Sequence, residues 1–152
     1  MAVKIVAVGK KHEAWIEQGV IRYQERLRRP FDVEWLLLPH SSREADSARQ
    51  EESERILAKL DERDYVVLLD ERGKEYDSPA LSRVFEQQLS HSRRIVLIIG
   101  GAYGVSQALH ARADVVWSLS PLVFPHQLVR LMLIEQLYRA QEIASGGSYH
   151  HI

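Results

Sequence analysis

The chain contains no cysteine among its 152 residues. This absence excludes a disulfide scaffold, a cysteine–zinc site and a catalytic cysteine. It is also typical of proteins that work in a reducing compartment, so we expect a cytoplasmic location. The seven histidines show no metal-binding spacing such as HExxH, and we predict no bound metal.

Long apolar runs are missing as well. The longest, at 95–99 and 131–134, are far shorter than the roughly 20 residues that a membrane-spanning helix needs. The N-terminal segment is too short for the apolar core of a signal peptide and leads into a charged stretch. We therefore expect no association with membranes. The length fits one domain, residues 1–152, with a single core.

Neither sign of charge is in excess, since the formal net charge is −1, and this balance argues against nucleic-acid binding. The distribution is uneven, however. Residues 1–30 carry seven basic and three acidic side chains, residues 31–77 seven and fourteen, and residues 78–152 six and four. A fold that joins the two ends would present a local positive face, whereas the simpler interpretation is a solvated surface with uneven charge.

Apolar segments that predict buried strands alternate with segments that predict helices. The strands are expected at 3–8, 33–38, 65–69, 95–99 and 115–119. The helices are expected at 14–28, 42–60, 78–90 (with Ser78 as cap), 106–112 and 127–144. This alternation predicts an α/β fold, in which helices cover both faces of a mainly parallel sheet. Because ligands bind beyond the carboxyl ends of such strands, the loops at 70–77, 100–105 and 120–126 form the candidate site.

The helix expected at 127–144 is apolar over most of its circumference. Such a helix must be buried on more than one side. In a chain of this size a second copy is a natural source of the extra contact surface. A helix at the centre of the core is the alternative interpretation.

Two loops have compositions that suit a ligand. Gly100-Gly101-Ala102-Tyr103-Gly104 allows a sharp turn and a close approach of backbone to ligand, although a plain tight turn fits equally well. It is neither a P-loop nor a dinucleotide fingerprint, because the spacing differs. Residues 118–126 form an apolar loop stiffened by two prolines. Such a loop suits an uncharged adenine ring, and a buried connection packed on the core is the alternative.

Several polar residues follow the second loop. His126 starts the last helix and can bond a substrate or move a proton, whereas a capping or core role is the more common one. Arg130 has the features of an ordinary surface residue. Glu135 and Arg139 are four residues apart and can pair along the helix. Tails such as Tyr149-His150-His151 are usually frayed.

Taken in order, these segments are similar to one family. The matching segments are 98–104, 117–120, 124–130, 135–140 and 149–150, with further agreement at 5–10 and 68–70. The ordered set resembles the ribosomal large subunit methyltransferase H family, which are small stand-alone members of the SPOUT superfamily. The resemblance extends over the whole chain.

The resemblance implies a fold, a cofactor and a substrate. The fold would be an α/β knot in which the C-terminal segment threads a loop to form a trefoil. The cofactor would be S-adenosylmethionine, and the protein would be a homodimer packed through its last helix. The substrate would be the pseudouridine in the helix 69 loop of 23S rRNA, methylated at N3 on assembled ribosomes. The expected cofactor-binding residues are Leu69, Gly100, Gly101, Gly104, Ser120, Pro121, Leu122, Val123, Phe124 and Pro125. One departure is Val123, where relatives often have Thr.

Four residues are expected to act on the RNA. His126 and Arg139 would position the base or stabilise its developing charge, and Tyr149 with His150 would close the site of the same or the neighbouring subunit. The sequence does not identify the general base. Because no separate RNA-binding domain is present, we expect recognition to need the composite surface of the ribosome. The alternatives are a non-catalytic nucleotide- or S-adenosylmethionine-binding module, and an NAD- or deoxyribonucleotide-type enzyme on an open sheet.

Overall fold

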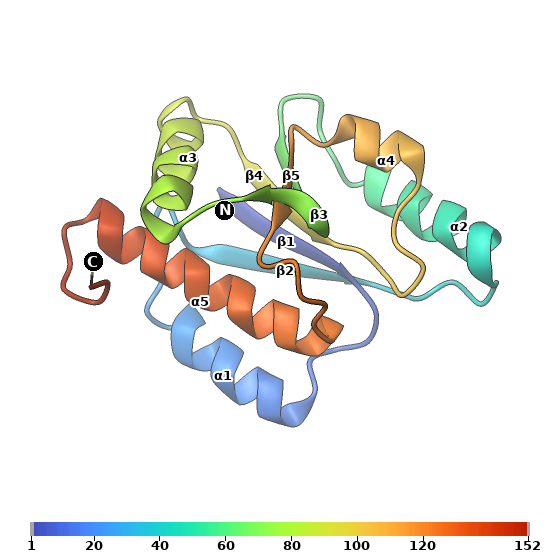
Figure 1. Ribbon diagram of the computed structural model, residues 1–152, viewed down its shortest axis with the longest axis horizontal. Coiled ribbons are helices and arrows are strands. Elements are labelled where there is room, and N and C mark those ends of the chain that lie inside the picture. Colours follow the sequence, from blue (N-terminus) through green and yellow to red (C-terminus); the bar gives the residue numbers. More distant parts are fainter. Residues whose placement is uncertain (1, 152) are drawn as a thin grey trace.

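The computed structural model describes residues 2–151 and shows strands alternating with helices (Figure 1). In chain order the elements are β1 (Val3–Val8), α1 (Ala14–Gln24), β2 (Val33–Leu38), α2 (Ala45–Leu57), β3 (Tyr65–Glu75), α3 (Ser78–Ser90), β4 (Ile95–Ile99), α4 (Gln107–Arg112), β5 (Val115–Ser118) and α5 (His126–Ala144).

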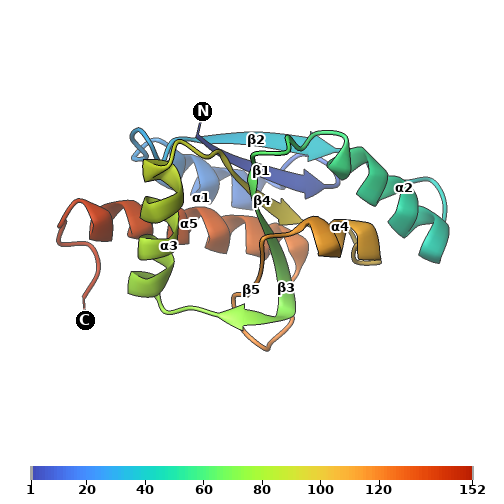
Figure 2. The same cartoon turned by 90° about the horizontal axis from the view of Figure 1, so that it is seen from above.

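The five strands form one sheet in the order β2-β1-β4-β3-β5, and every neighbouring pair is parallel. Helices α1, α3 and α5 cover one face, and α2 and α4 cover the other (Figures 1 and 2). The strand residues are apolar on both faces because both faces are covered. The predicted fold class is therefore confirmed, whereas the trefoil knot stays a prediction.

Each face of the sheet has its own hydrophobic core. On one side Leu133 and Leu137 of α5 and Phe85 of α3 pack on alternate residues of the strands. On the other side Ile56 of α2 and Leu109 of α4 pack on the intervening residues. The β4 segment is buried along its whole length because it lies at the centre of the sheet.

The third strand is longer than the sequence predicts. We expected it to end at Leu69 before a charged loop, but it extends to Glu75. Its pairing with β5 is interrupted after Leu69 and resumes at Lys74, which indicates a bulge. A Cβ on Gly73 would lie 2.5 Å from the carbonyl oxygen of Val116, so only glycine fits at this crossing. The prediction failed because charged residues on a bulged edge segment resemble a loop.

The first two helices are shorter than predicted. The first ends at Gln24 rather than Arg28, and the second extends from Ala45 to Leu57 rather than from Ser42 to Leu60. Asp77, not Ser78, caps α3, because its carboxylate accepts a hydrogen bond from the amide of Ala80 at 2.8 Å. The sequence pattern could not separate these adjacent capping residues, since both types are favoured there. The predicted cap of α4 is confirmed by the bond from the amide of Leu109 to Ser106.

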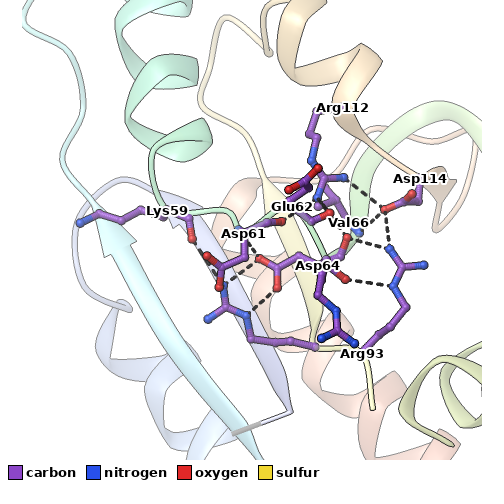
Figure 3. Close-up of polar contacts among 10 residues, drawn as sticks. Lys59, Asp61, Glu62, Asp64, Val66, Arg93, Arg112 and Asp114 are labelled. Atoms are coloured by element: carbon purple, nitrogen blue, oxygen red, sulfur yellow. Dashed lines mark hydrogen bonds and ion pairs between the residues drawn. The ribbon is translucent and has the colours of Figure 1, made fainter. Parts of the chain in front are cut away.

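The loops that precede β3, β4 and β5 are joined by an arginine–aspartate network (Figure 3). Arg94 donates two hydrogen bonds to the buried carboxylate of Asp64, at 2.9 and 2.8 Å. Arg112 donates to the carbonyl oxygens of Asp61 and Asp64, and Arg93 also reaches the latter. Burial acts to raise the pKa of Asp64, but the hydrogen bonds from Arg94 and from the Asp61 amide, together with the charges of Arg94 and Arg112, lower the pKa overall. The network fixes the edge of the sheet opposite the candidate site.

Candidate functional site

A cavity of about 300 Å³ opens at the carboxyl ends of β3, β4 and β5. The three loops proposed from the sequence meet around it, together with the start of α5. Its wall consists of residues 68–72, 99–102, Gly104, Val105, Trp117, Leu119, Ser120, 122–124, His126 and Val129. The arrangement agrees with the general position of ligand sites in parallel sheets.

One wall of the cavity carries a carboxylate. Arg72 donates to the side chain of Asp70 at 3.1 and 2.8 Å, and its backbone amide donates at 2.9 Å. The side-chain hydrogen bond from Arg72 lowers the pKa of Asp70, so that this carboxyl group is ionised at neutral pH. An ionised carboxylate in this position can accept hydrogen bonds from the hydroxyl groups of a ligand.

The glycine loop forms the second wall. Gly104 donates to the carbonyl oxygen of Gly101 at 3.0 Å and has a φ of +76°, a conformation that favours glycine. At Gly101 an added Cβ would lie 2.5 Å from Oε1 of Glu52, which is 4% exposed. The glycines therefore allow the loop backbone to turn tightly and to line the cavity.

The proline-containing loop forms the third wall and is braced by two serines. Ser118 Oγ donates to the carbonyl oxygen of Ser120 at 2.9 Å, and the Ser120 hydroxyl accepts from the amide of Leu122 at 3.0 Å. Leu122 and Val123 are 69% and 79% exposed on the rim. The structure does not place Pro121 and Pro125 on the wall, and Pro125 instead caps α5. The two prolines thus shape the loop but do not line the cavity.

His126 is the candidate catalytic residue that lines this cavity. It begins α5, and its pKa is lowered by burial and further by the positive charge of Arg130 and by His40. The imidazole is consequently uncharged at neutral pH and can accept a proton or a hydrogen bond.

The other three candidates lie at the opposite end of α5. The Tyr149 hydroxyl donates to Glu135 at 3.0 Å, and the Arg139 guanidinium donates to the same carboxylate at 2.8 Å. The Arg139 guanidinium also lies 3.0 Å from Nδ1 of His150. Burial, and then the hydrogen bond to Glu135, raise the pKa of Tyr149, so that its phenol stays protonated. The predicted Glu135–Arg139 pair is confirmed.

The C-terminal tail is folded back on α5 rather than frayed. The ring of Tyr149 packs edge-on against Tyr138 at 4.7 Å between centroids, and the Arg139 guanidinium lies over it at 4.7 Å. His150 lines a second hollow, of about 780 Å³, together with Tyr23 of α1, Trp117 of β5 and residues at the start of α3 and in the middle of α5. Figures 1 and 2 both show the tail at the end of α5 that is distant from the β5–α5 loop.

Within one chain the structure therefore separates the four candidates into two groups. His126 and Arg139 are thirteen positions apart on α5, which corresponds to about 20 Å along the helix axis. The cavity with His126 and the hollow with His150 have Trp117 and Leu119 as shared lining residues.

Sequence reasoning missed several residues near the cavity. Asp70 and Arg72 lie in the 70–77 segment, which the sequence predicted as a loop and the structure shows, up to Glu75, as the extension of β3, but no motif singled them out. Arg130 was treated as a surface residue, and this was wrong: it is 1% exposed. Arg130 follows His126 by four residues and therefore lies on the same face of α5. This spacing could have indicated that Arg130 points toward the protein interior near the site.

Comparison with known proteins identifies the family. A family model described as "Predicted SPOUT methyltransferase" matches residues 1–150. The chain belongs to the SPOUT methyltransferase family. S-adenosylmethionine is the cofactor of SPOUT methyltransferases, so membership confirms the cofactor expected from the sequence.

Two full-length relatives share about two fifths of the residues of this SPOUT protein. A protein of Hahella chejuensis is 40% identical over 99% of both chains, and one of Thioalkalivibrio sulfidiphilus is 39% identical over 99% of both. Each is named ribosomal RNA large subunit methyltransferase H. These relatives confirm the family resemblance on which the sequence predictions rest.

A solved structure supports the fold. A methylase family protein of Neisseria gonorrhoeae aligns over 99% of this chain and 87% of its own, with a TM-score of 0.54 and 10% identity. Among residues 2–151 no helix is long and apolar enough to cross a membrane. In the same part of the chain, no three acidic or histidine side chains gather as metal ligands.

Proposed function

We propose that this protein is an S-adenosylmethionine-dependent methyltransferase of ribosomal RNA. Its substrate would be N3 of the pseudouridine in the helix 69 loop of 23S rRNA, on assembled ribosomes in the cytoplasm, with residues 1–152 acting as one methyltransferase domain. The observation that carries the proposal is the cavity at the ends of β3, β4 and β5, which joins the expected cofactor loops to His126. The names of the full-length relatives support the RNA substrate.

The cavity fits the cofactor chemically. Apolar side chains of the 119–124 loop and the glycine backbone at 100–104 provide an uncharged part of the cavity wall suited to adenine. Because a Cβ on Gly101 would clash with Glu52, the backbone of the glycine loop is packed closely against this side chain. Asp70 would accept hydrogen bonds from the ribose hydroxyls. When bound, S-adenosylmethionine supplies an electrophilic methyl group.

His126 would handle the proton of the acceptor. N3 of pseudouridine carries a hydrogen that must leave when the nitrogen is methylated. An uncharged imidazole on the cavity wall can accept that proton, and its lowered pKa keeps it available at neutral pH. Holding the acceptor nitrogen in line with the methyl group would contribute further rate enhancement through orientation.

A homodimer would bring the two groups of candidate residues, His126 and the residues near the C-terminus, close together. Leu128, Met132 and Tyr138 of α5 remain half-buried in one chain, and a second copy packed along α5 would cover them. An antiparallel arrangement would bring Arg139, Tyr149 and His150 of one chain toward His126 of the other. The separation of about 20 Å along α5 supports this arrangement, because only His126 of the four candidates lines the cavity within one chain.

A methyl-transfer assay tests the proposal directly. Ribosomes from a strain that lacks the modification would be incubated with the protein and labelled S-adenosylmethionine, and the modified nucleoside would be located by mass spectrometry. We expect incorporation at one pseudouridine of 23S rRNA. Calorimetric binding of S-adenosylmethionine without any transfer would favour the non-catalytic module instead. Binding of NAD but not S-adenosylmethionine would favour the nucleotide-enzyme alternative.

A further inference from the structure

Arg130 is a buried cation without a carboxylate partner. It is 1% exposed, and among residues 2–151 no Asp or Glu oxygen lies within 4.0 Å of its guanidinium. Nη1 donates to the carbonyl oxygen of Lys10 at 2.9 Å and lies 3.4 Å from Nδ1 of His12. Nε has no hydrogen-bond partner in this part of the chain. Because buried charges are normally paired, this arrangement requires an explanation.

Arg130 holds the loop that connects β1 with α1. The loop begins at Gly9, which has a φ of +132° and donates to the carbonyl oxygen of Leu38 at 2.8 Å. A Cβ on Gly9 would lie 3.0 Å from Nε2 of His40 and 3.3 Å from Nη2 of Arg130. At the other end of the loop, His12 packs edge-on against Trp35 at 4.5 Å between centroids. The backbone between Gly9 and His12 is therefore fixed at both ends.

The fixed backbone carries two free lysines. Lys10 and Lys11 are both exposed, and neither has a carboxylate within 4.0 Å among the residues that the structure describes. The nearest acidic residue in the sequence, Glu13, accepts a hydrogen bond from Trp15 at 2.8 Å. Together with Arg130 these lysines concentrate three positive charges at the carboxyl end of β1. The fold thus brings parts of the two basic segments, 1–30 and 78–152, together at this point.

The loop lies at the same edge of the sheet as the cofactor cavity. Arg130 is one helical turn from His126, which lines that cavity, and its charge contributes to the lowered pKa of the His126 imidazole. An anion at the loop would consequently lie beside the reacting centre rather than at a remote surface.

We propose that Lys10 and Lys11, held in place by Arg130, bind phosphate groups of the RNA backbone beside the methylated nucleotide. The proposal rests on the proposed function. Two adjacent lysines on a fixed loop suit successive phosphates, and the unpaired charge of Arg130 adds to the attraction because it is little screened inside the protein. Phosphate contacts of this kind position the RNA without reading its sequence.

The test uses the intact protein with ribosomes that lack the modification. Lys10→Gln, Lys11→Gln and the double variant would be compared with the wild type for kcat, KM and the salt dependence of kcat/KM. We expect KM for ribosomes to rise severalfold in each single variant. The slope of log kcat/KM against log salt should fall by about one for each lysine removed. Affinity for S-adenosylmethionine, measured by calorimetry, should be unchanged.

Lys59→Gln is the matched control. Lys59 is exposed on the segment between α2 and β3, at the opposite edge of the sheet, and its removal changes the net charge equally. The proposal is overturned if the double variant keeps the wild-type KM and salt slope, or if Lys59→Gln changes them as much. Absence of methyl transfer by the wild-type protein would instead contradict the proposed function, which keeps the two failures distinguishable.

Discussion

Gly101 and the carboxylate of Glu52 are in contact with no room for a side chain between them. A Cβ at Gly101 would lie 2.5 Å from Oε1 of Glu52, while the other oxygen accepts a hydrogen bond from the amide of Ser41 at 2.9 Å. Glu52 is therefore tethered and cannot move aside freely. Since Gly101 also lines the cavity, any displacement at this contact changes the shape of the site.

The first prediction is that Gly101→Ala weakens cofactor binding. Overpacking of this kind costs about 1–3 kcal/mol, and it would displace the glycine loop toward the cavity. We expect at least a tenfold loss of affinity for S-adenosylmethionine by calorimetry, with a lower Tm. Gly146→Ala is the control, because Gly146 has a φ of +74° but open space around it and lies outside the site. An equal loss of affinity in both variants would contradict the steric explanation.

The second prediction concerns the pH dependence of methyl transfer. The pKa of His126 is lowered from 6.5, so the imidazole becomes active as a proton acceptor when pH rises through a value below 6.5. We expect kcat to increase up to that point and then to level. His126→Ala should reduce kcat by roughly 10²- to 10⁴-fold and abolish this step in the profile. A profile with the wild-type step in the variant would exclude His126 as the titrating group.

The same residue affects stability. Because the folded-state pKa of His126 is depressed, the unfolded chain binds its proton more tightly. The free energy of unfolding should therefore decrease as pH falls below 6.5 and stop decreasing below the folded pKa. His12 contributes with the same sign, since burial and Arg130 lower its pKa too. Urea denaturation of the wild type and His126→Ala between pH 5 and 8 would isolate the part due to His126, with the variant showing the weaker dependence.

The third prediction concerns the tail. Tyr149→Phe removes the hydroxyl that bonds Glu135 but keeps the ring that packs on Tyr138. If the hydroxyl positions the tail for catalysis, loss of about 1 kcal/mol corresponds to a decrease in kcat of about fivefold. Tyr149→Ala should lower kcat much further, with the cofactor affinity unchanged. Wild-type kcat in Tyr149→Ala would remove the tail from the mechanism.

The fourth prediction concerns the network of Figure 3. Asp64→Ala leaves Arg94 without the carboxylate that it contacts twice, and the free energy of unfolding should fall by about 2–4 kcal/mol at pH 7. The lowered pKa of Asp64 means that this stability is present above pH 3.8 and is lost as pH falls through the folded pKa. Urea denaturation measures both effects. Cofactor affinity should not change, because the network lies at the opposite edge of the sheet.

The alternation of apolar segments with amphipathic ones was sufficient to predict the strand positions and the parallel sheet. The starts and ends of β1, β2 and β4 follow directly from burial on both faces, as the fully buried 95–99 segment shows. The β3 extension could not be predicted in this way, because residues 70–75 are mostly charged and pair only along one edge. Local sequence does not reveal a partner strand that is distant in the chain.

The sequence located the segments of the candidate site but did not predict the burial of Arg130, for a similar reason. The three loops could be located, since their position depends only on the direction of the strands. The burial of Arg130 depends on how the 9–12 loop packs against α5, a contact between residues 120 positions apart. The separation of His126 from Arg139 along α5 could be calculated from helix geometry alone.

The extended third strand determines which parts of the cavity can be altered by engineering. Residues 74 and 75 pair with β5 after the bulge, so the wall that carries Asp70 is anchored in the sheet on both sides. An insertion or a loop graft there would shift the register of β5 and disturb the connection to α5. The 120–125 segment, in contrast, has no strand partner and projects Leu122 and Val123 to solvent. Libraries aimed at accommodating cofactor analogues should therefore vary Leu122 and Val123 and leave residues 70–75 intact.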